Sequence, residues 1–527
     1  MNYFVVAFIS ACSLLFAISN IAHAQSIQYI SRGLSLSSAI SAALSGNSNI
    51  LLAKNQEDLV RGAVQNARGI FDLTMNAQGG VTNTKDPLTL STRNTYSANG
   101  FDLRYNLTEV ATTQAGASKL FSNGLQANLV ATHTNTISNL YPPSDTQNQS
   151  IGALTFQLRV PILRNSGNSV SAQLRAFELE AEAARGDLEY TASNIVLSTA
   201  LAYWDYQAKT QRLKIARNSE LRGEEILEEL RKLIAADELP KSEINLGLAS
   251  QNDRRVSRIA AEQVQLESRR SLGRLLGFGA SDAMAIRELT DELPEDNGVS
   301  IGPLVSFSEE IISRALAART DLLTLKIRQN AAEILLDAAR KNARPQLDFI
   351  FGLTQNGLAE GAPRGSLGPA FGQNFGAGYS GSLVYQVPLE NNAALGSIQQ
   401  QAASVTSQRI RINELGHSIS NSIETSIFAM LRAVEQLREA EAAVKTYAAG
   451  LTNERTKRRL GLSTLINVLS VEERYNSALI SVVQARQAYA NAIAQFRFEA
   501  SMLITRDGNS YNASVNDLLN PNIRFTK

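Results

Sequence analysis

The chain has 527 residues with 50 Lys plus Arg against 49 Asp plus Glu, a net charge of +1, which excludes the strongly basic surface that nucleic acid or an anionic membrane surface would attract. Its single cysteine, Cys12, lies in an apolar N-terminal segment, so the rest of the chain can form no disulfide, thiolate metal site or cysteine nucleophile. At about 150 residues per domain the length suggests roughly three globular domains. However, the proline-free stretches from Pro161 to Pro240 and from Pro388 to Pro521 favour very long helices.

Residues 1–24 are predicted to be a signal peptide. A nearly continuous apolar run ends in Ala22-His23-Ala24, the small-x-small pattern that signal peptidase cleaves, so we expect a mature, exported chain that begins at Gln25. The segment Ile9-Ser10-Ala11-Cys12 loosely matches a lipoprotein cleavage box, so lipidation of Cys12 stays an alternative. After the leader, no apolar run reaches the about 18 residues that a membrane-spanning helix needs. A mature chain that enters a membrane must therefore do so as a β-barrel.

The rest of the chain predicts an internal duplication, in which each half has a helix, strands, a very long helix and a second helix. Asn66-Ala67-Arg68 precedes the first strand region, as Asn342-Ala343-Arg344 precedes the second. Val160-Pro161 ends the strands of the first half, as Val387-Pro388 ends those of the second.

The first repeat covers residues 25–276, and a linker rich in Asp, Glu, Gly and Pro covers 277–305. The second repeat covers 306–504, and a C-terminal tail covers 505–527. The predicted segments are helices 34–68, 170–237 and 241–276 with strands in 70–162, then helices 307–342, 395–459 and 463–503 with strands in 345–388.

The heptad spacing of apolar residues in the two long helices predicts coiled-coil seams along them. The apolar residues that recur every seven positions are Leu174, Ala181, Leu188, Ile195 and Ala202 in the first half, and Ile398, Val405, Ile412 and Ile419 in the second. A helix of roughly 65 to 70 residues spans on the order of 100 Å, far more than a globular core.

The strand segments alternate apolar and polar residues, as Leu154, Phe156 and Leu158 do against Thr155 and Gln157. Each segment is long enough to cross an outer membrane with one face to lipid and the other to a polar lumen, and a soluble β-sandwich is the alternative. The first half holds extra residues, which predict an added hairpin at about 96–136. The sequence leaves open whether this hairpin joins the barrel wall or stands outside the membrane.

The order and duplication of these features resemble the TolC-like outer membrane efflux protein family over essentially the whole mature chain. The residues that carry the resemblance are Val160-Pro161 and Val387-Pro388, the stretch Ala202-Tyr203-Trp204-Asp205, and Leu460-Gly461-Leu462-Ser463-Thr464-Leu465 followed by Val468-Leu469. The resemblance implies an α+β membrane protein that forms a homotrimer. Each chain would give four strands to a twelve-stranded outer-membrane β-barrel, continued by a long periplasmic α-helical coiled-coil barrel.

The resemblance also implies a function. The chain would be a passive exit duct in the outer membrane of a Gram-negative bacterium. A periplasmic adaptor would dock it onto an inner-membrane pump, proton-driven or ABC, for efflux or type I secretion of small molecules or proteins. The sequence identifies neither the cargo nor the pump, nor whether the tunnel rests closed.

The family's adaptor-docking tips match two helix–helix turns: Leu460, Gly461, Leu462 and Ser463 in the second half, and Asp237, Glu238, Leu239 and Pro240 in the first. Such a tip exposes backbone and apolar side chains that a partner hairpin can cover. A plain turn with Gly461 as the helix C-cap is the alternative.

Just inside the tips, the resemblance places a periplasmic constriction at Glu243, Asn467 and Ser470. Only Glu243 is charged, so we expect at most one acidic ring, which trimerisation would triple. Alternatively, Glu243 pairs with Lys241 or a nearby arginine as a solvated surface charge.

The sequence predicts no enzyme, metal site or cofactor. It lacks the P-loop and H-E-x-x-H motifs, and His133 and His417 are solitary. Two non-channel alternatives remain. A periplasmic adaptor normally has one α-hairpin rather than two symmetric halves, and a structural coiled-coil protein of the envelope would not need amphipathic strands at corresponding positions.

Overall fold

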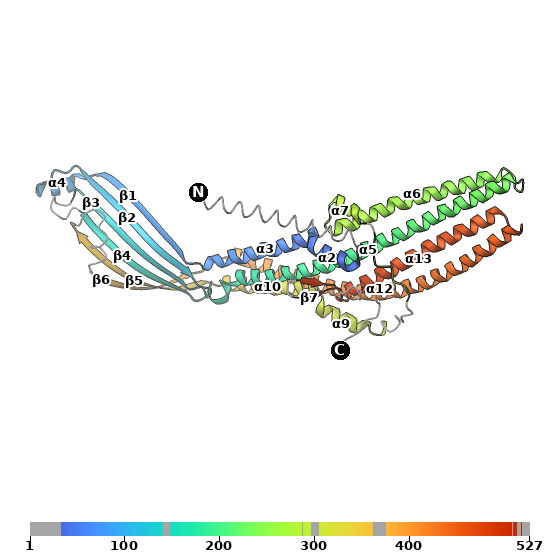
Figure 1. Ribbon diagram of the computed structural model, residues 1–527. Coiled ribbons are helices and arrows are strands. Elements are labelled where there is room, and N and C mark those ends of the chain that lie inside the picture. Colours follow the sequence, from blue (N-terminus) through green and yellow to red (C-terminus); the bar gives the residue numbers. More distant parts are fainter. Residues whose placement is uncertain are drawn as a thin grey trace. The chain divides into compact units, whose positions relative to one another are not determined.

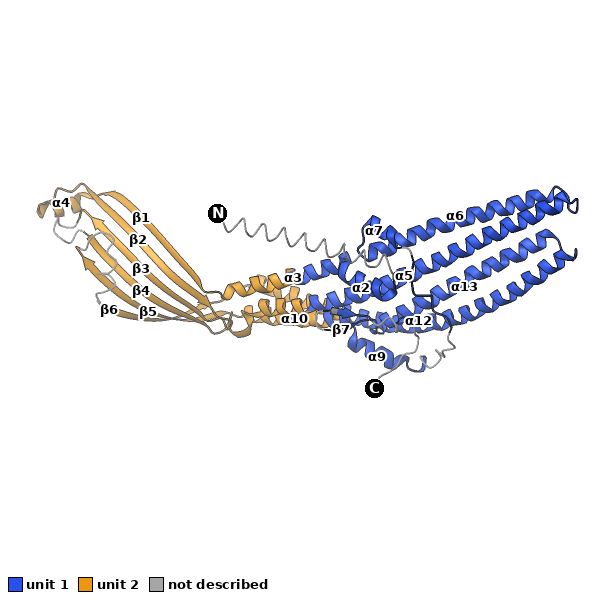
Figure 2. Cartoon of the chain, viewed as in Figure 1, with its two compact units in different colours: residues 1–58, 183–325, 411–527 blue, residues 59–182, 326–410 orange. Residues whose placement is uncertain are grey.

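The computed structural model describes residues 33–140, 148–286, 288–296, 305–361, 376–507, 510–513 and 518. The predicted signal peptide and Cys12 lie outside these residues. The chain forms two compact units, coloured separately in Figure 2. We call them the helical unit (Met1–Asp58, Ala183–Leu325 and Arg411–Lys527) and the sheet unit (Leu59–Glu182 and Lys326–Ile410).

The sheet unit contains one six-stranded antiparallel sheet whose strands follow chain order, β1-β2-β3-β4-β5-β6 (Figure 1). The strands are β1 (Thr74–Pro87), β2 (Tyr105–Leu120), β3 (Gln126–Ser138), β4 (Asn148–Pro161), β5 (Gln346–Glu360) and β6 (Gly376–Gln386). A short 3₁₀ turn, η1 (Gly69–Phe71), precedes β1, and another, η2 (Gly167–Ser169), follows β4. The sheet of this chain therefore contains six strands, two more than the four that the resemblance implies for the barrel wall.

The added hairpin is formed by β2 and β3, which lie between β1 and β4 in the sheet. Phe101 and Leu103, which lie within the range predicted for the hairpin, precede β2. A helix that the sequence analysis did not predict, α4 (Leu90–Ala98), lies between β1 and β2. Thr89 caps it by accepting a hydrogen bond from the Thr92 amide at 3.3 Å.

The helices of the first half are α2 (Leu36–Gly46), α3 (Ser48–Arg68), α5 (Ala172–Ala235), α6 (Glu243–Leu275) and α7 (Ala280–Ala285). Those of the second half are α9 (Ser308–Ala318), α10 (Thr320–Asn342), α12 (Asn392–Arg459) and α13 (Leu465–Glu499), followed by the short strands β7 (Thr505–Asp507) and β8 (Ser510–Asn512). Among the described residues, no helix is long and apolar enough to cross a membrane.

The helical segment predicted over 34–68 is divided into α2 and α3 at Asn47. The Asn47 side chain donates to the Leu275 carbonyl at 2.8 Å and accepts from the Asn49 amide at 2.9 Å, so it caps α3 and fixes the break against the end of α6. The backbones of Gly46 and Gly277 are in close contact at this point. A Cβ added to Gly277, where φ is +77°, would lie 2.2 Å from the Gly46 carbonyl oxygen.

The single helix predicted over 307–342 is wrong, because the structure divides it into α9 and α10 at Arg319. Arg319 has an extended backbone, with φ −66° and ψ 119°. Its guanidinium binds Asp321 at 2.7 Å and Glu499, at the end of α13, at 2.6 Å. These two buried ion pairs hold the residue out of the helix.

The main core of the helical unit packs α2 against α5, α13 and the segment after α6. Its largest fully buried side chains include Tyr203 and Trp204, whose rings meet edge to face with centroids 5.2 Å apart. The Tyr203 hydroxyl lies 2.9 Å from the Leu34 carbonyl and 3.2 Å from the Asp291 carboxylate. Burial raises the pKa of Tyr203 well above its ordinary value, so the hydroxyl stays protonated. A second core packs α9 against α12 and α13.

Candidate functional site

Two helix hairpins of the helical unit, α5–α6 and α12–α13, carry the residues that the sequence analysis assigns to docking and constriction. The α12–α13 tip turns at Gly461, which has φ +73°. The Gly461 amide donates to the Arg458 carbonyl at 2.9 Å, and the Leu462 amide donates to the Lys457 carbonyl at 2.8 Å. These are the hydrogen bonds that close a helix through a left-handed residue, the conformation that glycine adopts most readily.

The α5–α6 tip uses the same geometry with Asp237 as the left-handed residue, at φ +57°. The Asp237 amide donates to the Ile234 carbonyl at 3.1 Å, and the Glu238 amide donates to the Leu233 carbonyl at 3.0 Å. Aspartate is among the few non-glycine residues that tolerate this conformation. The helix ends at Ala235 and α6 begins at Glu243, so this tip is slightly longer than the sequence predicted.

The two tips expose different side chains. Leu460 and Leu462, on either side of Gly461 at the α12–α13 tip, are 69% and 74% exposed, which is a large apolar surface for one turn. Leu239 of the α5–α6 tip instead packs on a small cluster formed by Ile226, Leu230, Ile234, Ile244, Leu465 and Leu469. That cluster joins the two hairpins at their ends. Ser463, the last predicted docking residue, hydrogen-bonds Glu454, and this contact lowers the pKa of Glu454.

The three predicted constriction residues lie just behind the tips. Glu243 is half-buried at the start of α6, and no residue that the structure describes pairs with its carboxylate. Asn467 is exposed, and its amide is held by the Thr464 hydroxyl that caps α13. Ser470 lines a groove of about 520 Å³ between α5, α6 and α13. Glu243 is therefore the one charge of this predicted set.

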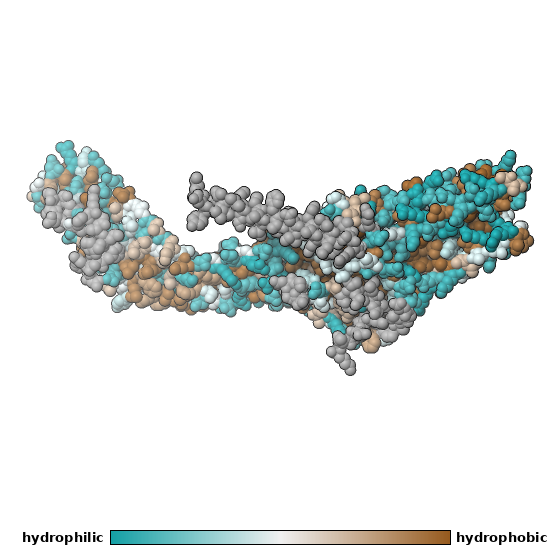
Figure 3. Space-filling view, in the orientation of Figure 1, coloured by the Kyte–Doolittle hydropathy of each residue, from teal (hydrophilic) through white to brown (hydrophobic). Residues whose placement is uncertain are grey.

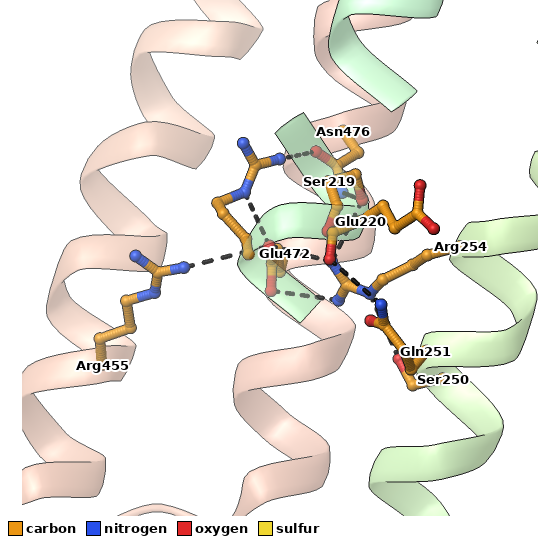
Figure 4. Close-up of polar contacts among 9 residues, drawn as sticks. Ser219, Glu220, Ser250, Gln251, Arg254, Arg455, Glu472 and Asn476 are labelled. Atoms are coloured by element: carbon orange, nitrogen blue, oxygen red, sulfur yellow. Dashed lines mark hydrogen bonds and ion pairs between the residues drawn. The ribbon is translucent and has the colours of Figure 1, made fainter. Parts of the chain in front are cut away.

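A buried ion network lies further along α13, centred on Glu472, whose side chain is fully buried (Figure 4). Arg254 of α6 binds it with two nitrogens, each 3.1 Å from a carboxylate oxygen. The Arg222 Nε of α5 lies 2.9 Å from Glu472 Oε1, and Arg455 of α12 approaches to 4.0 Å. The Glu472 carboxylate of α13 thus contacts one arginine from each of the other three helices of the two hairpins, α5, α6 and α12.

Hydrogen bonds to uncharged groups extend the network. Arg222 also binds Asn476, whose amide donates to the Ser219 hydroxyl at 2.9 Å. Arg254 Nη1 donates to the Ser219 carbonyl at 2.9 Å. Burial raises the pKa of Glu472, but the hydrogen bonds and positive charges of Arg254 and Arg222 outweigh it, so the pKa lies below its usual range.

The lowered pKa predicts that acid loosens the hairpins. A carboxylate whose pKa is depressed in the folded state stabilises it fully above the unfolded pKa of about 4.3, and this contribution is lost as pH falls through the folded value. We expect the distance between nitroxides at Glu238→Cys and Leu462→Cys, measured by pulsed electron resonance, to be narrowly distributed at neutral pH and to broaden as the pH falls below the unfolded pKa and through the lower folded pKa of Glu472. In a Glu472→Gln background, the distribution should no longer depend on this titration. A neutral-pH distribution that persists in acid would contradict the prediction.

The sequence analysis did not identify the Glu472 network. A signal was present, because Leu465, Val468 and Glu472 follow the i, i+3, i+7 spacing of one helix face and all three are buried. A lone carboxylate in such a stripe indicates a buried partner. The partners, however, lie 250 and 218 residues away in the chain, so spacing alone could not identify them.

The described residues contain no group of three or more His, Cys, Asp or Glu side chains that could hold a metal ion. His133 lies on β3, where its Nε2 is 2.7 Å from the Ser150 hydroxyl of β4. It is thus a strand residue with a cross-strand hydrogen bond.

Comparison with known proteins gives one sequence match. Residues 311–498 match the family model described as outer membrane efflux protein. No curated protein sequence matches the chain.

Solved structures share the fold. The CmeC outer membrane channel of Campylobacter jejuni has a TM-score of 0.65 at 11% identity, over 89% of this chain and 85% of that chain. The outer membrane protein VceC of Vibrio cholerae has a TM-score of 0.62 at 15% identity, over 88% and 95%. The open-state MtrE outer membrane channel of Neisseria gonorrhoeae has a TM-score of 0.60 at 13% identity, over 88% and 88%. The helix-rich chain with its one large sheet therefore has the fold of these channels.

Proposed function

Because residues 311–498 carry an outer membrane efflux protein domain, as the resemblance predicted, we propose that the chain is the outer-membrane exit duct of a tripartite efflux or type I secretion system. The family consists of transport channels, so the prediction that the chain is not an enzyme is confirmed. The observation that carries the proposal is the combination, in one chain, of two long helix hairpins and a sheet that exposes large apolar side chains.

The sheet supports a place in the outer membrane. Met75, Val81, Tyr379, Leu383 and Tyr385 are all large apolar residues of the edge strands, and each is more than half exposed. Figure 3 shows apolar side chains gathered over β5 and β6. A soluble protein rarely exposes so large an apolar surface, whereas a lipid-facing barrel wall requires it.

The hairpins support a helical tunnel of a homotrimer in the periplasm. Their seam residues Leu188, Ile195, Val405 and Ile419 are buried, as coiled-coil packing requires. The matching left-handed turns at Asp237 and Gly461 support an internal duplication. So do the two cores, in each of which a short helix, α2 or α9, packs on a long one. Export through the predicted signal peptide, residues 1–24, belongs to the same proposal.

Docking of a periplasmic adaptor, itself bound to an inner-membrane pump, is proposed at the tips. The exposed Leu460 and Leu462 would fill apolar pockets of the adaptor, while the exposed carboxylates of Asp237 and Glu238, next to Pro240, would form a polar rim. A plain solvated turn does not need two exposed leucines.

Leu462→Asp is expected to abolish export without affecting assembly. An interface hot spot contributes at least about 2 kcal/mol, so adaptor affinity should fall roughly thirtyfold or more. The measurement is drug susceptibility of cells together with the amount of oligomer in the outer membrane. Leu221→Asp, at a leucine that is 57% exposed on α5, is the control and should keep export. Normal export by Leu462→Asp would show that this tip is not part of the docking surface.

Single-channel conductance in a planar bilayer tests the duct itself. The purified oligomer should show discrete conductance with a preference for K⁺ over Cl⁻, because three copies of Glu243 would form a negative ring. Glu243→Gln should bring the preference toward unity, and Glu238→Gln, an exposed tip carboxylate, should leave it unchanged. If the purified oligomer does not conduct, even after Arg458 or Arg459 is replaced to loosen the tip, the exit duct is refuted.

A further inference from the structure

We propose that the β2–β3 hairpin is part of the barrel wall and that β6 of one copy pairs with β1 of the next. Three copies of the six-stranded sheet then close an eighteen-stranded exit pore, in place of twelve strands. The inference rests on the trimer of the proposed function and goes beyond it, since it sets the width of the exit.

Backbone pairing makes the hairpin continuous with the sheet. β2 pairs with β1 from Tyr105 to Ser118 and with β3 from Thr108 to Leu120. β3 pairs in turn with β4 along nearly its whole length, from Gln126 to Ile137. A hairpin outside the wall would leave β1 paired directly with β4. Instead, two full strands separate them.

An apolar band on one face of the sheet continues through part of the hairpin. The register places Leu129 of β3 opposite Ala117 of β2 and Phe156 of β4, and Phe156 lies opposite Leu353 of β5. The apolar side chains of this face are Met75, Ala77 and Val81 on β1, Leu107, Ala111, Ala115 and Ala117 on β2, Leu129 and Ala131 on β3, Leu154, Phe156 and Leu158 on β4, Phe349, Phe351 and Leu353 on β5, and Tyr379, Leu383 and Tyr385 on β6. In the hairpin the same face also carries Glu109, Thr113 and Lys119 on β2 and His133 and Asn135 on β3, toward the ends of the strands and outside the band that Ala115, Ala117, Leu129 and Ala131 form.

The opposite face of the hairpin is polar and almost uncharged. Its polar residues are Asn106, Thr108, Thr112, Gln114 and Ser118 on β2, and Gln126, Asn128, Thr132, Thr134, Thr136 and Ser138 on β3, and the same face also carries Val110, Leu120 and Val130. A hairpin that projected into water would not need one apolar face aligned with its neighbours. Alternation in register with the wall is what a strand between lipid and lumen requires.

The unpaired edges of β1 and β6 indicate that a second copy of the chain covers them. Every residue of β1 and of β6 is exposed, and within the described chain each strand pairs on one side only. In lipid an unpaired row of N–H and C=O groups is prohibitively costly, so the edges must be covered. Because six is even, β1 and β6 run in opposite directions, and a β6–β1 contact between copies continues the antiparallel pattern.

Eighteen strands change the size of the exit. With about 4.8 Å between strands and a tilt of about 40°, the backbone diameter is roughly 36 Å, against about 24 Å for twelve strands. Natural barrels of about this strand number enclose an aqueous channel. The wall would then impose little size selection and would admit polypeptide cargo as well as small molecules.

Disulfide trapping in the mature chain, which has no cysteine once the leader is removed, tests the pairing. Val81→Cys on β1 is combined in turn with Tyr379→Cys, Gly381→Cys or Leu383→Cys on β6, all on the apolar face. One of these pairs should give covalent dimers and trimers on oxidation of outer membranes. As positive control, the register partners Leu129→Cys and Phe156→Cys should link within one chain.

The outcomes separate this inference from the proposed function. An oligomer that is trimeric by native mass but gives no β1–β6 link, or in which Val81→Cys links to Phe156→Cys within a chain, overturns the eighteen-stranded wall and leaves the duct intact. If the purified oligomer is not trimeric, both the eighteen-stranded wall and the proposed trimeric duct are contradicted.

Labelling of adjacent hairpin residues gives an independent test. Asn128→Cys on the polar face should react in intact outer membranes with a membrane-impermeant maleimide that enters the lumen. Leu129→Cys on the apolar face should react only after denaturation. Equal reaction at both positions would place the hairpin in water and overturn the inference.

Discussion

Replacing Glu472 by glutamine is expected to release the two hairpins from each other. The substitution keeps the size of the side chain but leaves Arg254 and Arg222, whose side chains are 11% and 23% exposed, without their counter-charge. Removal of one partner of a buried pair costs about 3–5 kcal/mol, because the remaining charge stays buried. Local opening near the tips should become more frequent by roughly two to three and a half orders of magnitude.

Hydrogen exchange at neutral pH measures this opening, in the backbone amides of α6 around Arg254 and of α13 around Glu472. Glu473→Gln is the matched control, since Glu473 is the next residue on α13 and is exposed. If exchange in Glu472→Gln equals that of the control, the network does not hold the hairpins together. In the bilayer measurement, the same variant should show more frequent openings than the wild type.

Replacing Arg319 by alanine is expected to be similarly destabilising, at about 3–5 kcal/mol of unfolding free energy. Arg319 binds Asp321 and Glu499, whose side chains are 13% and 11% exposed, so its loss leaves two buried carboxylates unpaired. It also removes the guanidinium from over the rings of Phe498 and Tyr190, at 5.5 and 5.8 Å. Arg319→Lys should rescue little, since an ammonium cannot reproduce the planar contact with Asp321.

Urea unfolding of the detergent-solubilised protein gives the measurement. The control is Arg314→Ala, which removes an i,i+4 pair with Glu310 on the same helix segment, with both side chains more than 40% exposed. Such an exposed pair contributes at most about 1 kcal/mol. Equal losses in the two variants would mean that burial adds nothing to the Arg319 contacts.

Local patterns predicted the elements whose signal lies within one segment. The heptads that include Leu188 and Ile419 lie in α5 and α12, whose ends fall within a few residues of the expected ranges. Gly461 marks the turn where it was expected, since a left-handed residue has a strong composition signal.

Contacts between distant segments were not predictable in the same way. The break at Arg319 depends on Glu499, which lies 180 residues away, so the helical periodicity on either side concealed it. Alternation also could not place the β2–β3 hairpin. Leu129 has the same apolar neighbours in sequence whether the hairpin joins a wall or stands in water, and only pairing with Phe156 decides between them.

The contact between Gly46 and Gly277 has a consequence for biogenesis. α2 carries a buried apolar face, but the surface that covers it includes the end of α6, and Leu34 is fixed by backbone hydrogen bonds to Glu288 and Thr290. These partners are synthesised long after α2. Closing so long a loop is slow relative to local helix formation. The apolar face of α2 therefore stays uncovered, and open to non-native contacts, until more than half of the chain has been made.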